Sequence, residues 1–187
     1  MIYLDKTVED LKLKLGEYTT KKETFCPIVN PDYFEPTQVI FQDPAEISGW
    51  KEYAKEVQVS TSKFIHELIS WVPHSEFKFM IRQPLQEILF NSLMYRQGED
   101  YSLSVEVAKG QNKLSVVQIT NPNYDAMSFD LKTRIDWLES THCLEVLPRE
   151  LRTNGGQGLR MLMRSNFPVV YEDGGNICAI SNVSLKY

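Results

Sequence analysis

Apolar residues recur at two different periods along this chain, and the change of period divides it into a helical part and a strand-rich part. Before Gly98 they recur every three or four positions, which is the spacing of one helix face. After Gly98 they alternate with polar residues over 102–108 and again over 113–121, with KGQN between the two runs. This pattern predicts a β-hairpin. Residues 167–185 predict two further strands, joined at Asp173-Gly174-Gly175.

The first 42 residues show three kinds of pattern. A short helix is predicted over Thr7–Tyr18, because Val8, Leu11 and Leu15 share one face. The next stretch, 21–37, is polar and carries three prolines, so we expect an irregular connection there. The run Thr37–Gln42 has the composition of a short strand.

The helical part continues to Gly98. Asp43-Pro44 is typical of a helix start, and the helix that follows is expected over 45–57. A second helix is expected to begin near Ser60 or Ser62 and to end before Pro73. The run LQEILFNSLMYRQG, residues 85–98, is also helical in pattern, and Pro84 either opens this helix or kinks one that began near Ser75.

Helices grouped with hairpins predict an α+β fold, a two-layer α/β sandwich in which helices cover one face of a mixed sheet. A doubly wound parallel sheet fits less well, because two of the strand pairs are direct hairpins. Residues 1–36 are expected to form an N-terminal extension, a short helix plus an irregular segment, and residues 37–187 a single domain. A helix over 131–140 and another after the glycines at 155–158 complete the predicted elements.

Composition narrows the function classes. The 187 residues carry a net charge of −5 and a pI of about 5.3, so a broad nucleic-acid surface, which needs a basic face, is not expected. The N-terminus lacks the pattern of a signal peptide, and no apolar run is long enough to span a membrane. Three widely spaced cysteines do not suggest a disulfide framework. A cytoplasmic location is the default interpretation.

Two polar side chains interrupt the apolar pattern of the predicted helix around residue 87. Glu87 and Asn91 lie four residues apart, on the side roughly opposite the apolar residues of that helix. An asparagine oxygen can bind a hard cation, and a neighbouring carboxylate can orient or deprotonate a hydroxyl group or water. A solvated helix face, however, explains such a pair more often than a site does.

A glycine-rich run forms the second candidate. Asn154 precedes Gly155, Gly156 and Gly158, and Leu159 begins the apolar pattern of a helix. Glycines let the backbone approach an anion, and the N–H groups of a helix N-terminus favour negative charge. A flexible loop followed by a capped helix explains the run equally well.

Together and in this order, these motifs resemble the GHKL superfamily of histidine-kinase-like ATPases. LQEILFNSLMYRQG is similar to its N-box, NGGQGLRMLMR to its second glycine box, and VVYEDGGNICAISNVSL to its closing strands. The layout is most similar to the anti-sigma-factor serine kinases. The resemblance covers residues 75–185 and implies the ATP-binding fold of the superfamily, the Bergerat fold, with bound ATP and Mg²⁺.

The resemblance also implies roles for individual residues. Asn91 would be the Mg²⁺ ligand and Glu87 the general base, while Gly155, Gly156, Gly158 and Leu159 would hold the phosphates. Asn176 in the closing hairpin would contact the nucleotide. A lid is implied over 124–154. Arg152 and Arg160 flank the glycines in the sequence, and from this proximity alone we expect them to add positive charge at the γ-phosphate. The partner would be a signalling protein that is phosphorylated on a serine. Whether the chain also forms a homodimer is left open by the resemblance.

Asn121 occupies the position at which the superfamily has the aspartate that binds the adenine amino group. The two glycines that follow this aspartate in the family motif are also replaced here. An amide oxygen is a weaker acceptor than a carboxylate. The alternative function is therefore an interaction module that keeps the fold and has lost turnover or nucleotide binding.

Overall fold

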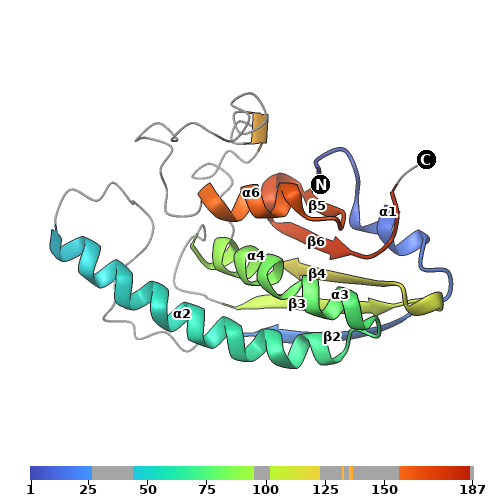
Figure 1. The fold of residues 1–187 in the computed structure, drawn as a ribbon, viewed down its shortest axis with the longest axis horizontal. Coiled ribbons are helices and arrows are strands. Elements are labelled where there is room, and N and C mark those ends of the chain that lie inside the picture. The colour runs from blue at the N-terminus through green and yellow to red at the C-terminus, as the bar shows by residue number, and fades with distance from the viewer. Residues whose placement is uncertain (27–43, 95–101, 123–131, 133–134, 137–155, 186–187) are drawn as a thin grey trace.

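The computed structural model describes residues 1–26, 44–94, 102–122, 132, 135–136 and 156–185. Its centre is a six-stranded mixed sheet with the order β1-β5-β6-β4-β3-β2 (Figure 1). β1 pairs with β5 in parallel, and the other neighbouring strands are antiparallel. The strands are β1 Ile2–Tyr3, β2 Thr19–Phe25, β3 Leu103–Lys109, β4 Ser115–Thr120, β5 Val169–Glu172 and β6 Ile177–Ser181. The predicted α+β class with a mixed sheet is confirmed.

Both predicted hairpins are present. β3 and β4 pair antiparallel through the short 3₁₀ helix η1 Gln111–Lys113, in which Asn112 has a φ of 53°. β5 and β6 are joined by η3 Asp173–Gly175, where Gly174 and Gly175 both have positive φ. Glycine adopts this backbone region without strain, so the Asp-Gly-Gly signal marked the turn correctly.

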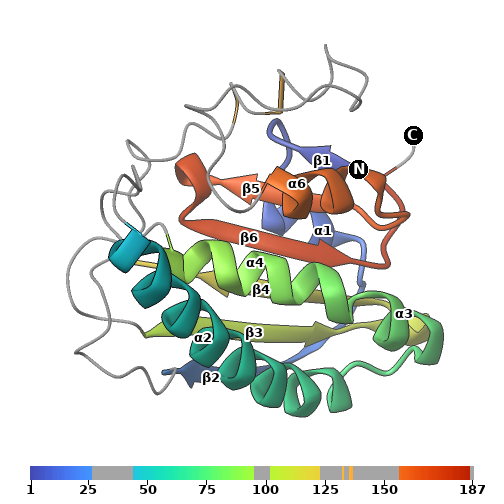
Figure 2. The ribbon, with the colours of Figure 1, turned by 60° about the vertical axis from the view of Figure 1, so that its left-hand side comes forward.

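Helices α2 Pro44–Ser70, α3 Ser75–Met80, α4 Arg82–Met94 and α6 Gly156–Arg164 lie on one face of the sheet (Figures 1 and 2). Their apolar side chains form the main core with Val105, Val107, Val117 and Ile180 of the strands. Within it Phe25 of β2 stacks on Phe64 of α2, with ring centroids 4.4 Å apart. This contact fixes α2 against the β2 edge of the sheet.

A second, smaller core lies on the other face of the sheet. α1 spans Val8–Leu13. Leu11 of this helix and Leu15, which follows it, pack there with Val116 and Ala179. These strand residues alternate with those of the main core, as side chains on opposite faces of a sheet must. Thr7 caps α1 in a capping box with Asp10. The expectation that helices cover only one face is therefore incomplete, because α1 covers part of the second face.

Two strands within the first 25 residues belong to the same sheet as the later strands. β1 and β2 form its two edges, and β2 pairs with the whole length of β3, from Thr19 opposite Lys109 to Phe25 opposite Leu103. The expectation of an irregular connection is thus wrong for residues 21–25, where cross-strand pairing overrides a polar composition. The predicted strand Thr37–Gln42 and the predicted domain boundary at residue 36 lie outside the described residues.

The helix from Pro44 to Ser70 is continuous, so the expected break near Ser60 is wrong. The hydroxyl groups of Thr61 and Ser62 donate to the carbonyl of Gln58, at 3.1 and 2.7 Å, and are satisfied within the helix instead of capping a new one. Pro84 lies in the first turn of α4, where a missing N–H costs no helical hydrogen bond. Of its two interpretations, the helix opening is correct.

Within the described ranges, no helix combines the length and the apolar character that crossing a bilayer requires.

Candidate functional site

Several of the predicted site residues lie toward one end of the sheet, where β4 ends and β6 begins; we call it the Asn121 end. α4 arrives there with its last turn, since Asn121 is hydrogen-bonded to Ser92. α6 contacts α4, and its first residue also lies toward the Asn121 end. This follows because the segment after its last turn reaches the opposite end of the sheet, where Phe167 packs against Phe77 of α3. The start of the glycine helix and the end of the Glu87 helix thus share this end (Figure 2).

Asn121 connects the sheet to α4. Its side-chain nitrogen donates a short hydrogen bond to the carbonyl of Ser92, and its backbone N–H donates to the carbonyl of Asn176 at 2.8 Å. The residue is only 1% exposed. A buried side chain whose amide nitrogen binds a backbone carbonyl of α4 has a structural role, because it joins the end of β4 to this helix.

Asn176 lies beside Asn121 in the turn between β5 and β6. Its side-chain nitrogen donates to the carboxylate of Asp173 at 2.7 Å, while its side-chain oxygen is buried and has no hydrogen-bond partner among the described residues. Buried polar atoms are rarely left unpaired in folded proteins, so this oxygen, which has no partner within the described residues, can accept a further hydrogen bond at the Asn121 end. The Asp-x-x-Asn spacing in the turn was the sequence signal for the Asp173 contact.

Glu87 is half-buried on α4, away from the flank that faces α2. On that other flank Arg82 contacts His66 at 3.0 Å and Gln86 contacts Ser62 at 3.4 Å. Glu87 follows Gln86 by about 100° around the helix, which turns it away from this flank. Burial raises the pKa of its carboxyl group above the usual value. Among the described residues it has no ion-pair partner, so burial is the only cause found for this shift.

The other predicted residues are placed less completely. Asn91 follows Glu87 by one turn of α4, and Gly156 and Gly158 lie in the first turn of α6. Leu159 is 3% exposed and belongs to the main core, so its contacts are with the protein interior. Gly155, Arg152 and nearly all of the predicted lid over 124–154 lie outside the described residues.

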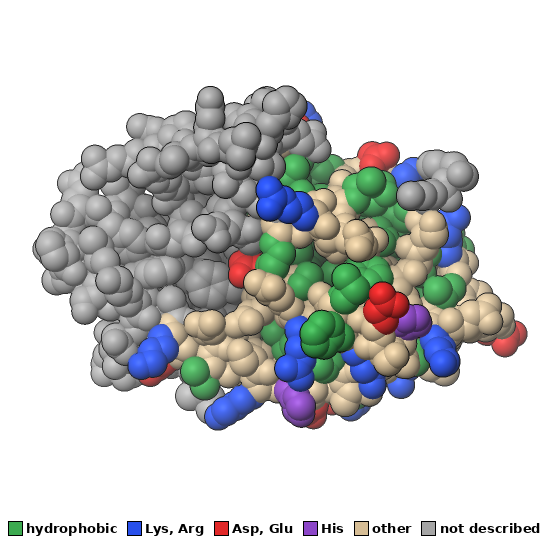
Figure 3. Space-filling model, in the orientation of Figure 1, with side chains coloured by type: hydrophobic (Ala, Val, Ile, Leu, Met, Phe, Trp, Pro, Cys, Tyr) green, Lys and Arg blue, Asp and Glu red, His purple; other side chains and the backbone are tan. Residues whose placement is uncertain are grey.

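No cluster of three or more His, Cys, Asp or Glu side chains suitable for a metal ion occurs in the part of the chain that the structure describes. Mg²⁺ commonly takes only one or two protein ligands and keeps several waters, so a single asparagine remains compatible with the predicted site. On the described part of the face shown in Figure 3, Lys and Arg side chains lie apart from one another, mostly among uncharged side chains, and do not merge into a continuous basic patch.

The neighbouring elements carry three kinds of group. A half-buried carboxylate of raised pKa can accept a proton. A free buried amide oxygen can accept a hydrogen bond, and a helix that begins with glycines can receive an anion at its N-terminus. Sequence reasoning found these groups, but it did not find the Asn121–Ser92 bond that joins two of the elements carrying them.

No protein-family model, curated protein or solved structure matches the chain significantly.

Proposed function

We propose that this chain is an ATP-binding signalling protein of the histidine-kinase-like type, with the Bergerat arrangement of helices over a mixed sheet. It would bind a protein partner in a manner that depends on Mg²⁺ and ATP, and would phosphorylate a serine of that partner. The cytoplasm is the compartment in which such an activity finds its nucleotide.

The observation that carries the proposal is the convergence of separate motifs at the Asn121 end. The helix of Glu87 and Asn91 lies beside the helix that begins at Gly156, although some 60 residues separate the two motifs in the sequence. Asn121 and Asn176, from different hairpins, are hydrogen-bonded to each other there. A triphosphate site requires this kind of convergence, and a set of unrelated solvated motifs does not.

Residues at the Asn121 end offer partners for the adenine and a phosphate of ATP and for Mg²⁺. The unpartnered oxygen of Asn176 can accept a hydrogen bond from an amino group such as that of adenine. The N–H groups at the start of α6 can receive a phosphate, and Asn91 would ligate Mg²⁺. When bound, ATP supplies the phosphoryl group. The raised pKa of Glu87 makes this carboxylate a stronger base for the proton of a serine hydroxyl group.

The test is equilibrium binding of a non-hydrolysable ATP analogue with and without Mg²⁺. We expect Mg²⁺-dependent binding in the wild type and at least about tenfold weaker binding in Asn91→Ala and Gly156→Ala, each of which removes one predicted contact. Asn166→Ala, an exposed asparagine at the opposite end of the sheet, is the matched control. Affinities that are equal across all four proteins, or absent altogether, would refute the nucleotide site.

An interaction module without turnover is the second candidate, and Asn121 favours it. The position expected to bind the adenine amino group holds a buried neutral amide whose nitrogen is used to bind Ser92. Purified protein that shows no thermal shift with ATP and Mg²⁺, yet still captures a partner, would support this function. Protein that retains ADP or ATP through purification would exclude a module that has lost nucleotide binding, and hydrolysis or transfer of the γ-phosphate would exclude one that has lost turnover.

A further inference from the structure

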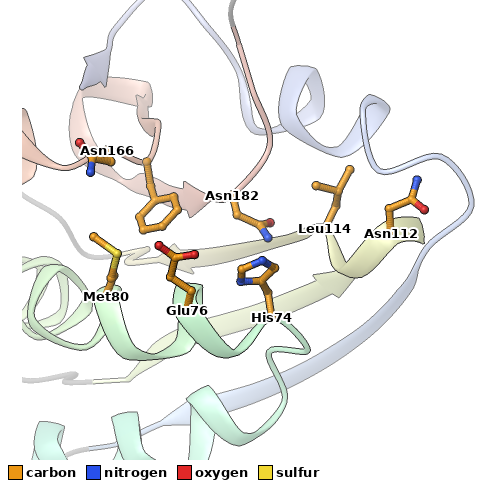
Figure 4. A pocket seen from close by; sticks show the side chains of 8 residues that line it. His74, Glu76, Met80, Asn112, Leu114, Asn166 and Asn182 are labelled. Atoms are coloured by element: carbon orange, nitrogen blue, oxygen red, sulfur yellow. The ribbon is translucent and has the colours of Figure 1, made fainter.

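A pocket at the opposite end of the sheet is separate from the Asn121 end. It encloses about 350 Å³ between α3, the β3–β4 connection, the segment after α6 and the residue that follows β6 (Figure 4). Small-molecule sites in proteins begin at about this size. The pocket is lined by His74, Glu76, Met80, Asn112, Leu114, Asn166, Phe167 and Asn182.

One wall of the pocket is apolar and fixed in place. Phe167 meets the fully buried Phe77 edge-on, with ring centroids 4.7 Å apart, and therefore cannot turn away from the pocket without losing this contact. Leu114 packs against the second core, and Met80 adds a flexible apolar side chain from α3. This wall suits the hydrocarbon part of a ligand.

Two side chains of the polar wall form hydrogen bonds within the protein. The Asn182 side chain accepts from the N–H of Ser115 at 2.7 Å and donates to the carbonyl of Lys113 at 3.1 Å. The Nδ1 atom of His74 accepts from the N–H of Phe77 at 3.1 Å. Both side chains are thus held in place by hydrogen bonds to the backbone.

Glu76 is the one carboxylate among the described residues that line the pocket, and no lysine or arginine is among them. Figure 4 shows its side chain between those of Met80 and His74, facing Asn166 and Asn182 across the pocket. In the described part of the chain, its carboxylate has no ion pair or hydrogen bond, since no lysine or arginine lies within 4.0 Å of it. A single carboxylate beside an apolar wall is complementary to a cation with an apolar body.

We propose that this pocket binds a small organic cation, of the arylalkylamine type, with its ammonium group on Glu76 and its apolar part against Phe167, Leu114 and Met80. The carboxylate would accept charge-assisted hydrogen bonds from the ammonium group. The site is independent of the proposed nucleotide site, because it lies at the other end of α4 and α6 and shares no residue with it.

The experiment compares three probes of similar shape and different charge: phenethylamine, 2-phenylethanol and 3-phenylpropionate. Binding is followed by the amide chemical shifts of the protein during titration, which also locate the site. We expect saturable shifts at residues of the pocket with phenethylamine, at least about tenfold weaker binding of the alcohol, and none of the acid. Equal binding of the three, or no binding of any at millimolar concentration, would overturn the proposal.

Glu76→Gln tests the charge directly, since it keeps the shape of the side chain at an exposed helix position. We expect phenethylamine to bind about tenfold more weakly to this variant and with wild-type affinity to Glu67→Gln, an exposed carboxylate on α2 away from the pocket. Unfolding curves of both variants check that the fold is intact. If Glu76 serves only the first turn of α3, the two variants will bind the amine equally, and the proposal fails.

Discussion

Replacing Asn121 by aspartate changes the hydrogen bond that joins the sheet to α4. In the wild type the Asn121 amide donates to the Ser92 carbonyl at a site that is 1% exposed. An ionised aspartate has the same size but no donor, so the Asn121→Asp variant loses this bond and sets a negative charge against the carbonyl oxygen. The substitution also introduces the residue that the resemblance implies at this position.

The cost of Asn121→Asp can be worked from these contacts. Leaving a buried acceptor without its donor costs about 1–3 kcal/mol, and a desolvated charge adds to this, so we expect a loss of at least about 2 kcal/mol in the free energy of unfolding at about pH 7. Burial would hold the pKa of the new carboxyl group above its unfolded-state value. The penalty is then present above the unfolded-state pKa and shrinks as the pH falls and the group becomes protonated.

The assay is urea unfolding followed by tryptophan fluorescence at about pH 7 and about pH 5. The control is Asn166→Asp, which makes the same change at an exposed position and should alter stability by less than about 0.5 kcal/mol. If Asn121→Asp is as stable as this control at about pH 7, the Asn121–Ser92 bond does not contribute as described. A loss that is identical at both pH values would refute the assignment of part of the cost to a buried charge.

Two further predictions concern the helices on the two faces of the sheet. Glu87→Gln should raise the free energy of unfolding at about pH 7, because burial raises the pKa of Glu87 and disfavours its charged form. The gain should be less than about 1 kcal/mol, since the group is partly exposed, and it should vanish near pH 4. A variant less stable than the wild type at about pH 7 would contradict this prediction. Leu11→Ala should destabilise by about 2.5–5 kcal/mol in urea unfolding, because Leu11 is fully buried in the second core, whereas Leu13→Ala, on the same helix and 79% exposed, should change stability by less than about 0.5 kcal/mol. Equal effects of these two alanine variants would show that α1 does not pack on the sheet.

Alternation of apolar and polar residues predicted the hairpins well, because each of their strands has one face on the main core. β3 and β4 follow this pattern, with Val105, Val107, Val117 and Ile119 all facing the helices. β2 does not, because it is an edge strand whose side chains are mostly exposed. Its position depends on cross-strand pairing and on contacts with the helix side, among them Phe25 with Phe64 and Lys21 over the ring of Trp71, which a polar sequence does not reveal.

The candidate site was predicted to a similar degree. Helical periodicity places Glu87 on a flank away from the apolar stripe, and the structure agrees. The neighbourhood of Asn121 and Asn176 follows from the hairpins and from the pairing of β4 with β6, which no local pattern encodes. The bond from Asn121 to Ser92 could not be foreseen, because its acceptor is a backbone carbonyl that any residue would supply.

The two edges of the sheet have a consequence for the order of events during synthesis. β1 is translated first, yet its neighbour β5 is among the last strands to leave the ribosome, since Ile2 pairs with Val169. A nascent chain therefore cannot complete this sheet until β5 and β6 have emerged, and β2 likewise cannot pair until β3 has emerged. During that interval the unpaired edges are open to association with other chains. Rapid translation shortens this interval, and a low concentration of nascent chains reduces such association. Both conditions should therefore raise the yield of folded protein.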